Sequence, residues 1–287
     1  NFNDFYDPQI KRSNIASHLN QAEYRLIEGD IRDRGLIENT FRQNKFDTVI
    51  HLAAMAGVRP SLLNPVLYQE VNLIGTMNIL EACRDSGVAN YIFASSSSVY
   101  GNNRKVPFAE TDAVDNPISP YAATKKSGEL MAYTYHHLYG IKTACLRFFT
   151  VYGPRQRPEM AIHYFTDRIF QGLEIPMFGD GRSRRDYTYI DDIVSGIIAC
   201  IDAKYKYEIF NLGRSDTIEL AELIKKIERL AGHSAKIVRQ SMQPGDVLQT
   251  YADITKATEL LSYKPTTSID KGLENFVRWY AERQKNR

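Results

Sequence analysis

A chain of 287 residues is long enough to bury one large hydrophobic core or two smaller ones. Hydrophobic residues make up 43% of it and charged residues 24%, which is ordinary for a globular protein. The formal net charge of +2 argues against a dedicated nucleic-acid binder, and no apolar run approaches the roughly 18 residues that a membrane-spanning helix needs.

Predicted strands and helices alternate in the first half of the chain. Residues 23–29 and 48–52 are short apolar runs typical of buried strands, and residues 35–44 between them have helical spacing. A long helix is predicted over residues 64–86, where Gly87 ends it.

A strand with polar residues at its end comes next. Residues 91–94 predict a buried strand, and four serines, residues 95–98, follow it directly. Ser119 is a suitable N-cap and Pro120 suits the first helical position, so we predict a helix from there to near Gly140. Strands separated by helical crossovers indicate a parallel, doubly wound α/β sheet, which is the fold class that we predict.

The composition changes after residue 150. Glycines, prolines and arginines concentrate in residues 153–157 and 179–185, which is typical of loops. We predict that this half forms a smaller lid domain, with one or two of its elements returning to the main sheet. The remaining predicted elements are strands over residues 143–149 and 208–212 and helices over residues 190–202, 217–231 and 270–284.

Three polar residues have a pattern suited to proton transfer. Tyr121 and Lys125 lie four positions apart, so they share one face of the predicted helix. The serine run lies at the carboxyl end of a strand, where open α/β sheets bind their ligands. A nearby ammonium group lowers the pKa of a phenol from about 10, and a hydroxyl such as that of Ser96 can share the proton. The tyrosine–lysine spacing alone is common by chance, and the serine run and the fold make it indicative.

The cysteines and histidines do not suggest a metal site. Cys83, Cys145 and Cys200 are far apart and lie in apolar stretches, as small buried residues of a reducing compartment do. Clustered ligands are lacking, so we predict no metal. We expect a cytoplasmic protein, and the alternative is a protein whose N-terminal anchor was removed before Asn1.

Seven stretches carry a family resemblance. The chain resembles the extended short-chain dehydrogenases/reductases, in the branch of NAD-dependent nucleotide-sugar epimerases and dehydratases, and within it the UDP-glucuronate 4-epimerases most. The match runs over essentially the whole chain. The stretches are Gly29-Asp30-Ile31-Arg32, His51-Leu52-Ala53-Ala54, Ala56-Gly57-Val58-Arg59, residues 94–101, residues 121–125, residues 148–154 with 157–160, and Arg185-Asp186-Tyr187.

The resemblance implies NAD as the cofactor and a dinucleotide-binding domain over residues 1–150, to which elements of residues 186–212 return. Residues 151–287 would then mainly bind substrate. Tyr121 would take the proton of the sugar's 4-hydroxyl, with Ser96 as its hydroxyl partner and Lys125 as the cation that tunes it and binds the nicotinamide ribose. The implied cofactor-binding residues are Asn1, Asp30, Ile31, Leu52, Ala53, Ala54, Asn72, Tyr121, Lys125 and Phe148. Asp30 could instead simply end a strand, Ala53 and Ala54 could be packing residues, and Asn72 a helix-surface amide.

The resemblance also implies a site for an anionic substrate. Arg157 would hold a uronic carboxylate and Arg185 a diphosphate, since a guanidinium fork suits both groups. The implied substrate-binding residues are Ser97, Ser98, Thr150, Arg157, Met177, Arg185 and Asp246, of which Met177 lies in a uracil-packing stretch and Asp246 near the uridine. Any single arginine is ordinarily a solvated surface charge, but five in two loops favour an anionic ligand.

The implied reaction is 4-epimerisation of UDP-glucuronate to UDP-galacturonate through a 4-keto sugar. The 4,6-dehydratases and uronate decarboxylases carry an acidic residue where this chain has Ser97, so the acid for elimination is absent. A UDP-hexose 4-epimerase, another nucleotide-sugar-modifying member of the family, and a non-catalytic nucleotide-sugar-binding protein are the alternatives. The helices that begin near residues 64 and 121 resemble those of a two-fold dimer interface, which Tyr133, Tyr135, His137 and Leu138 could face.

One part of the family pattern is missing from this sequence. The family begins with a strand, a glycine-rich turn that cradles the pyrophosphate, a helix and a second strand ending in an acid, and Asn1 aligns just after that acid. We therefore expect the sequence to be part of a longer polypeptide. Residues 1–287 alone should neither hold NAD tightly nor stay soluble, and micromolar NAD binding in a fluorescence titration would contradict this expectation.

Overall fold

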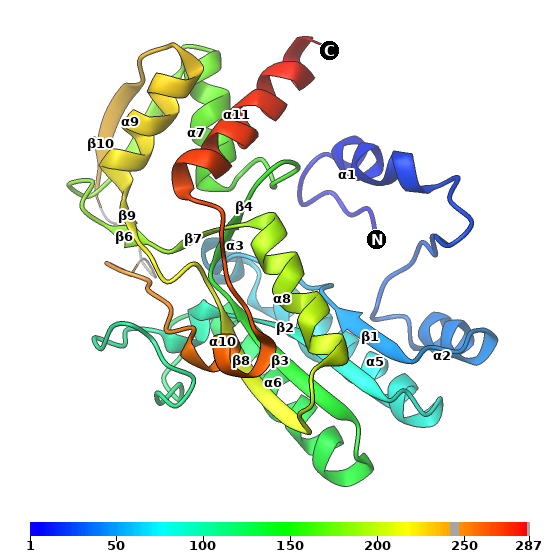
Figure 1. The fold of residues 1–287 in the computed structure, drawn as a ribbon. Helices are drawn as coiled ribbons and strands as arrows, with labels where there is room; N and C mark the ends of the chain where they lie inside the picture. Colours follow the sequence, from blue (N-terminus) through cyan, green and yellow to red (C-terminus); the bar gives the residue numbers. More distant parts are fainter. Residues whose placement is uncertain (242–246, 286–287) are drawn as a thin grey trace.

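Four strands form one parallel sheet in the computed structural model, which describes residues 1–241 and 247–285 (Figure 1). The strands are β1 (Thr48–His51), β2 (Asn90–Ser96), β3 (Lys142–Phe148) and β8 (Tyr207–Leu212), in that order across the sheet. Ser96 pairs with Phe148, and Phe148 pairs with Leu212. The carboxyl ends of three strands therefore line up along one edge.

Helices cover both faces of the sheet, which confirms the doubly wound α/β fold. On one face, α2 (Arg34–Gln43), α5 (Gly75–Asp85) and α6 (Pro120–Tyr139) enclose a core that includes Tyr91 and Phe93 of β2. On the other face, α8 (Ile190–Asp202) and α10 (Thr255–Leu261) pack over Ile92, which is also in β2. Alternate residues of the same strand thus enter two different cores.

Helix α6 is fixed at both ends and along its buried face. The Ser119 hydroxyl accepts a hydrogen bond from the backbone N–H of Ala122 at 3.1 Å, and Pro120 occupies the first turn. The helix stops at Gly140, which adopts the left-handed conformation with φ of 71°. A Cβ on Gly128 would lie 2.3 Å from the ring of Phe93, so the glycine lets the helix approach β2 closely. These features confirm the predicted helix and hold its first turn beside the end of β2.

The long helix predicted over residues 64–86 is also present, with one irregularity. It runs as α4 (Pro65–Gln69), a π-helical turn η2 (Glu70–Ile74) and α5, after the short helix α3 (Val58–Leu63). π-Helical turns are rare and often occur at functional sites. This turn carries Asn72.

The second half of the chain builds its own core and also completes the main sheet. That core includes Ile162, Ile175, Leu223 and Phe276, and β8 and α8 belong instead to the main sheet and its cover. Its helices are α7 (Ala161–Phe170), α9 (Leu220–Ala231) and α11 (Ile269–Lys285); its strand pairs are β5 (Glu174–Phe178) with β10 (Lys236–Gln240), β4 (Thr150–Tyr152) with β7 (Tyr187–Tyr189), and β6 (Arg184–Arg185) with β9 (Ile218–Glu219).

One predicted strand and one predicted helix boundary were wrong. Residues 23–29 form no strand, and Leu26 and Ile27 are 36% and 41% exposed. An apolar run becomes a strand only beside a pairing partner, and within the described residues β1 pairs with β2 alone. The helix predicted from residue 217 begins at Leu220, because residues 218 and 219 pair with β6. In the parts of the chain that the structure describes, no helix is both long and apolar enough to cross a membrane.

Candidate active site

The structure brings Ser96, Tyr121 and Lys125 together at the carboxyl edge of the sheet. Ser96 ends β2, and the other two residues lie one turn apart at the start of α6. The Lys125 ammonium nitrogen lies 5.9 Å from the centre of the Tyr121 ring and donates a hydrogen bond of 2.6 Å to the carbonyl of Ala94. Lys125 is only 4% exposed, so its charge acts in a poorly solvated environment.

The phenol of Tyr121 is under opposing influences. Burial raises its pKa, whereas a hydrogen bond with the Ser96 hydroxyl and the charge of Arg157 lower it. The Ser96 hydroxyl oxygen also accepts a hydrogen bond from the backbone N–H of Ser98 at 3.1 Å. Arg157 is thus electrostatically linked to the phenol, a link that the sequence reasoning did not include.

Lys125 gives the site a pH-dependent stability. Burial lowers the pKa of its ammonium group from 10.5 to about 8. Between these values the unfolded chain binds a proton that the folded chain has released, so stability rises with pH. Relative to a Lys125→Met variant, the free energy of unfolding should therefore increase by about 1–3 kcal/mol from pH 8 to about pH 10.5. Urea unfolding of both proteins across this range measures the difference, and a constant difference would contradict the expectation.

A buried ion pair lies behind the catalytic edge. Arg147 of β3 donates two hydrogen bonds, of 2.9 and 3.0 Å, to the carboxylate of Glu129 in α6, and both side chains are 1% exposed. Ser95, next to Ser96, donates to the same carboxylate at 2.6 Å, and Arg147 also bonds the Tyr100 hydroxyl at 3.0 Å. The network fixes the end of β2 against α6. Sequence reasoning missed it, although an arginine inside a predicted buried strand is a signal.

Several of the predicted cofactor residues line one pocket of about 340 Å³. Asn1 donates a hydrogen bond of 2.9 Å to the Asp30 carboxylate, which is also paired with Arg32 at 2.9 Å. Hydrogen bonds from Arg32 lower the pKa of Asp30 and keep it ionised as an acceptor. The predicted residues that line the pocket are Asn1, Asp30, Ile31, Ala53 and Ala54; Leu52 is exposed just after β1, and Phe148 is half-buried at the end of β3.

Asn72 is buried, so it is not a helix-surface amide. Its side-chain oxygen accepts from the backbone N–H of Met55 at 2.7 Å. Its amide nitrogen donates to the Met55 carbonyl and to the Thr124 hydroxyl, each at 3.0 Å. These bonds tie the wall of the pocket that carries Met55 to the helix of Tyr121, so Asn72 supports the pocket through the backbone. Its direct contact with a cofactor stays a prediction.

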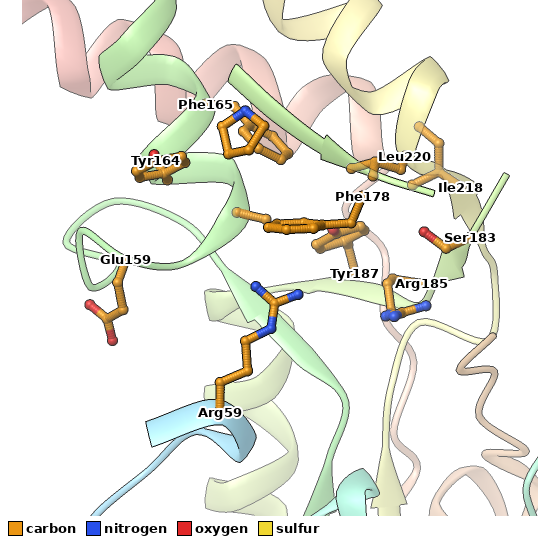
Figure 2. Close-up of a pocket in the computed structure, with 12 residues that line it drawn as sticks. Arg59, Glu159, Tyr164, Phe165, Phe178, Ser183, Arg185, Tyr187, Ile218 and Leu220 are labelled. Carbon is orange, nitrogen blue, oxygen red and sulfur yellow. The ribbon is translucent and has the colours of Figure 1, made fainter. Parts of the chain in front are cut away.

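A second pocket, of about 370 Å³, lies between the two halves of the chain (Figure 2). Phe178 lies inside it, and the guanidinium of Arg59 approaches to 4.4 Å from the centre of its ring. Arg185 of β6 and Tyr187 of β7 form the neighbouring wall. The pocket combines aromatic faces with two cations, as a nucleotide site does, and we call it the nucleotide-sized pocket. Arg59 lies in one of the motif stretches but was not predicted as a site residue.

Two predicted substrate residues need comment. Met177 is 4% exposed inside the core of the second half and does not line the nucleotide-sized pocket. Neighbouring side chains of a strand point to opposite faces, and Pro176 and Phe178 line the pocket instead. Asp246 lies outside the described residues.

A smaller pocket of about 190 Å³ shares Arg185 with the nucleotide-sized one. Ser97, Ser98 and Thr150 line it, so the structure brings four predicted substrate residues together. Its hydroxyl-rich wall could bind the alcohol groups of a sugar. Among the described residues, no three histidine, cysteine, aspartate or glutamate side chains are grouped so that they could hold a metal ion.

Arg157 does not line either of these two pockets. It pairs with Glu159 at 2.8 Å, and its guanidinium lies 5.6 Å from the centre of the Phe5 ring. Its charge still lowers the pKa of Tyr121. The N-terminal segment therefore reaches the catalytic region, a contact that the sequence did not indicate.

A doubly wound sheet with a serine, a tyrosine and a lysine at its carboxyl edge defines a short-chain dehydrogenase/reductase, and the large second half makes it an extended one. The chain belongs to the family of GDP-mannose 4,6 dehydratase, whose model matches residues 3–276.

Relatives are similar over nearly the whole chain. A UDP-glucuronate 4-epimerase of Thermodesulfobacterium geofontis is 44% identical over 283 residues, which cover 98% of this chain and 87% of that protein. UDP-glucuronate 4-epimerase 3 of Arabidopsis thaliana is 44% identical over 98% of this chain and 69% of that protein. The crystal structure of UDP-glucuronic acid 4-epimerase from Bacillus cereus, in complex with UDP-glucuronic acid and NAD, matches with a TM-score of 0.90 and 36% identity over 96% of this chain and 87% of that one.

Proposed function

We propose that the protein is an NAD-dependent 4-epimerase that converts UDP-glucuronate to UDP-galacturonate through a transient 4-keto sugar. The observation that carries the proposal is the cluster of Ser96, Tyr121 and Lys125 beside pockets suited to a nucleotide and a sugar. Relatives named for this reaction support it.

The residues on the cofactor side fit a dinucleotide. Ala53 and Ala54 have small side chains that let a flat ligand lie against the backbone. Asp30, which is ionised and accepts hydrogen bonds from Asn1 and Arg32, lines the same pocket. Lys125 lies where it could donate to ribose hydroxyls next to the reacting ring. NAD, when bound, supplies the acceptor that takes a hydride from carbon 4 of the sugar and returns it to the other face, so no net oxidation results.

Tyr121 moves the proton. Its phenolate accepts the proton of the 4-hydroxyl as the carbonyl forms, and the phenol returns that proton when the alcohol is restored. Ser96 forms a hydrogen bond with the phenol oxygen of Tyr121 and shares the negative charge that develops there. The charge of Arg157 lowers the pKa of Tyr121, against the burial that raises it. The Lys125 ammonium group lies 5.9 Å from the centre of the Tyr121 ring, close enough for a cation to favour the phenolate.

The nucleotide-sized pocket suits a uridine diphosphate. Phe178 and Tyr187 offer faces on which a base can stack, and aromatic stacking of a base contributes about 1–3 kcal/mol. Arg59 and Arg185 can each form bidentate bonds with phosphate oxygens. Ser97, Ser98 and Thr150 then lie in the adjoining pocket, where the sugar would follow the diphosphate.

The substrate's carboxylate makes its position critical. Oxidation of carbon 4 in a glucuronate gives a β-keto acid, which loses carbon dioxide readily. Arg157, with help from Ser97 and Thr150, would hold the carboxylate in a geometry unsuited to that loss. Ser97 replaces the acid that elimination requires, which favours epimerisation over dehydration.

The test follows UDP-glucuronate incubated with the full-length protein and NAD. We expect UDP-galacturonate without accumulation of NADH. An Arg157→Ala variant should lose about tenfold or more in kcat/KM on UDP-glucuronate, because a charge-assisted hydrogen bond contributes about 1.5–3 kcal/mol. Its loss on UDP-glucose should be smaller, because there only the effect of its charge on the pKa of Tyr121 is removed. Equal losses on both substrates would favour a UDP-hexose epimerase, NADH release a net dehydrogenase, and binding without turnover a non-catalytic protein.

We also propose a homodimer, the division into a cofactor domain over residues 1–150 and a substrate domain over residues 151–287, and a cytoplasmic location. Leu130, Tyr133 and Leu138 are exposed on α6, whereas Tyr135, which was expected to face a partner, is buried. A monomer in sedimentation at micromolar concentration would contradict the dimer.

The buried free cysteines suit a reducing compartment, and cell fractionation would test the location.

A further inference from the structure

The guanidinium of Arg157 already has partners on both terminal nitrogens. Nη1 lies 2.8 Å from the Glu159 carboxylate, and Nη2 lies 3.4 Å from the sulfur of Met160. The ring of Phe5 is 5.6 Å away. Arg157 is 30% exposed and Glu159 is 42% exposed, so this pair forms at a solvated rim.

A uronate carboxylate cannot bind both terminal nitrogens of Arg157 without displacing the Glu159 carboxylate from Nη1 and the Met160 sulfur from Nη2. Two N–H groups on one edge of a guanidinium bind a carboxylate best, and Glu159 occupies one of the two terminal nitrogens. Two carboxylates on one guanidinium also repel each other. Glu159 lines the rim of the nucleotide-sized pocket, and Figure 2 shows its carboxylate pointing away from Phe178, on the side where it can move into solvent.

We infer that Glu159 is a specificity-determining residue: it is an internal carboxylate that occupies Arg157 until the carboxylate of the substrate replaces it. The inference rests on the proposed function, which assigns Arg157 to the uronate. With a neutral sugar in the site, Arg157 keeps Glu159 as its partner. With a uronate, the exchange weakens the binding of substrate and product alike, so it aids product release.

Removal of the internal carboxylate should therefore tighten uronate binding. Exposed ion pairs change equilibria by about two- to fivefold, so a Glu159→Gln variant should lower the Kd of UDP-glucuronate by about that factor. The Kd of UDP-glucose should stay unchanged, because that sugar does not displace Glu159. Binding is measured calorimetrically at low ionic strength in the NAD-loaded Tyr121→Phe protein, so that turnover does not interfere.

Two further variants make the test specific. Glu274→Gln removes a carboxylate of similar exposure from an ion pair on α11, and it should change neither Kd. In an Arg157→Ala background, Glu159→Gln should lose its effect on UDP-glucuronate. The inference is overturned if Glu159→Gln weakens UDP-glucuronate binding, leaves it unchanged, or tightens both ligands equally. Failure of the proposed function is a separate result, because it appears as absence of UDP-galacturonate with the unmodified protein.

Discussion

A Tyr121→Phe variant is expected to lose about 100- to 10,000-fold in kcat, which is the usual contribution of a positioned acid–base group. The substitution removes only the hydroxyl, so the ring keeps its edge contact with Tyr68, whose centre lies 6.2 Å away. Ser96 and Lys125 would remain in place at the end of β2 and in α6. Conversion of UDP-glucuronate to UDP-galacturonate measures kcat.

The control keeps the same chemical change and moves it away from the site. Tyr139 lies at the end of α6 and is exposed, so Tyr139→Phe should retain kcat within about twofold. The Tyr121→Phe protein should still bind NAD and UDP-glucuronate, which separates a lost proton transfer from a lost fold. An unchanged kcat in Tyr121→Phe would remove the tyrosine from the mechanism.

Breaking the buried pair of Glu129 and Arg147 should have the largest effect on stability. A Glu129→Leu variant leaves the Arg147 guanidinium without a carboxylate in a site that is 1% exposed, and such losses cost about 3–5 kcal/mol. Burial opposes the charge, but hydrogen bonds and the charge of Glu129 raise the pKa of Arg147, so the guanidinium is ionised in the folded protein. Urea unfolding measures the loss.

The two halves of the pair should not be equivalent. In an Arg147→Met variant, Glu129 keeps the hydrogen bond from Ser95 and the Lys126 ammonium group at 3.6 Å, so the loss should be smaller than in Glu129→Leu. The double variant should recover part of the stability, because no unpaired charge remains. Arg278→Met breaks an exposed pair with Glu274 and should change stability by less than about 1 kcal/mol. Equal effects of Glu129→Leu and Arg278→Met would contradict this account.

Local signals in the sequence were sufficient for the elements that carry the catalytic residues. The N-cap Ser119, Pro120 and Gly140 define α6 without reference to the rest of the chain, and a spacing of four places Tyr121 and Lys125 on one face. Once the strand before the serine run is recognised, the position of Ser96 follows from the rule that parallel strands end at a common edge.

Some of the failures involve partners that are distant in the sequence, and others involve local geometry. Whether residues 23–29 form a strand depends on a neighbouring strand, and an apolar run carries no information about that neighbour. Met177 lies between Pro176 and Phe178, which line the pocket, but strand alternation sends its own side chain to the core. Arg157 contacts Glu159 within one local turn, whereas its contact with Phe5 depends on how the N-terminal segment packs against the second half of the chain.

The position of β8 limits how the two halves can move. This strand comes from the second half of the chain, yet it hydrogen-bonds to β3 along six residue pairs. A polypeptide that ended at residue 150 would leave β3 with an open edge and would uncover Ala144 and Leu146. The chain therefore crosses the cleft more than once, and these crossings tether the two sides. If the cleft opens to admit a nucleotide sugar, the two sides must rotate slightly about these connecting segments. A full separation of the two sides would break the hydrogen bonds between β3 and β8.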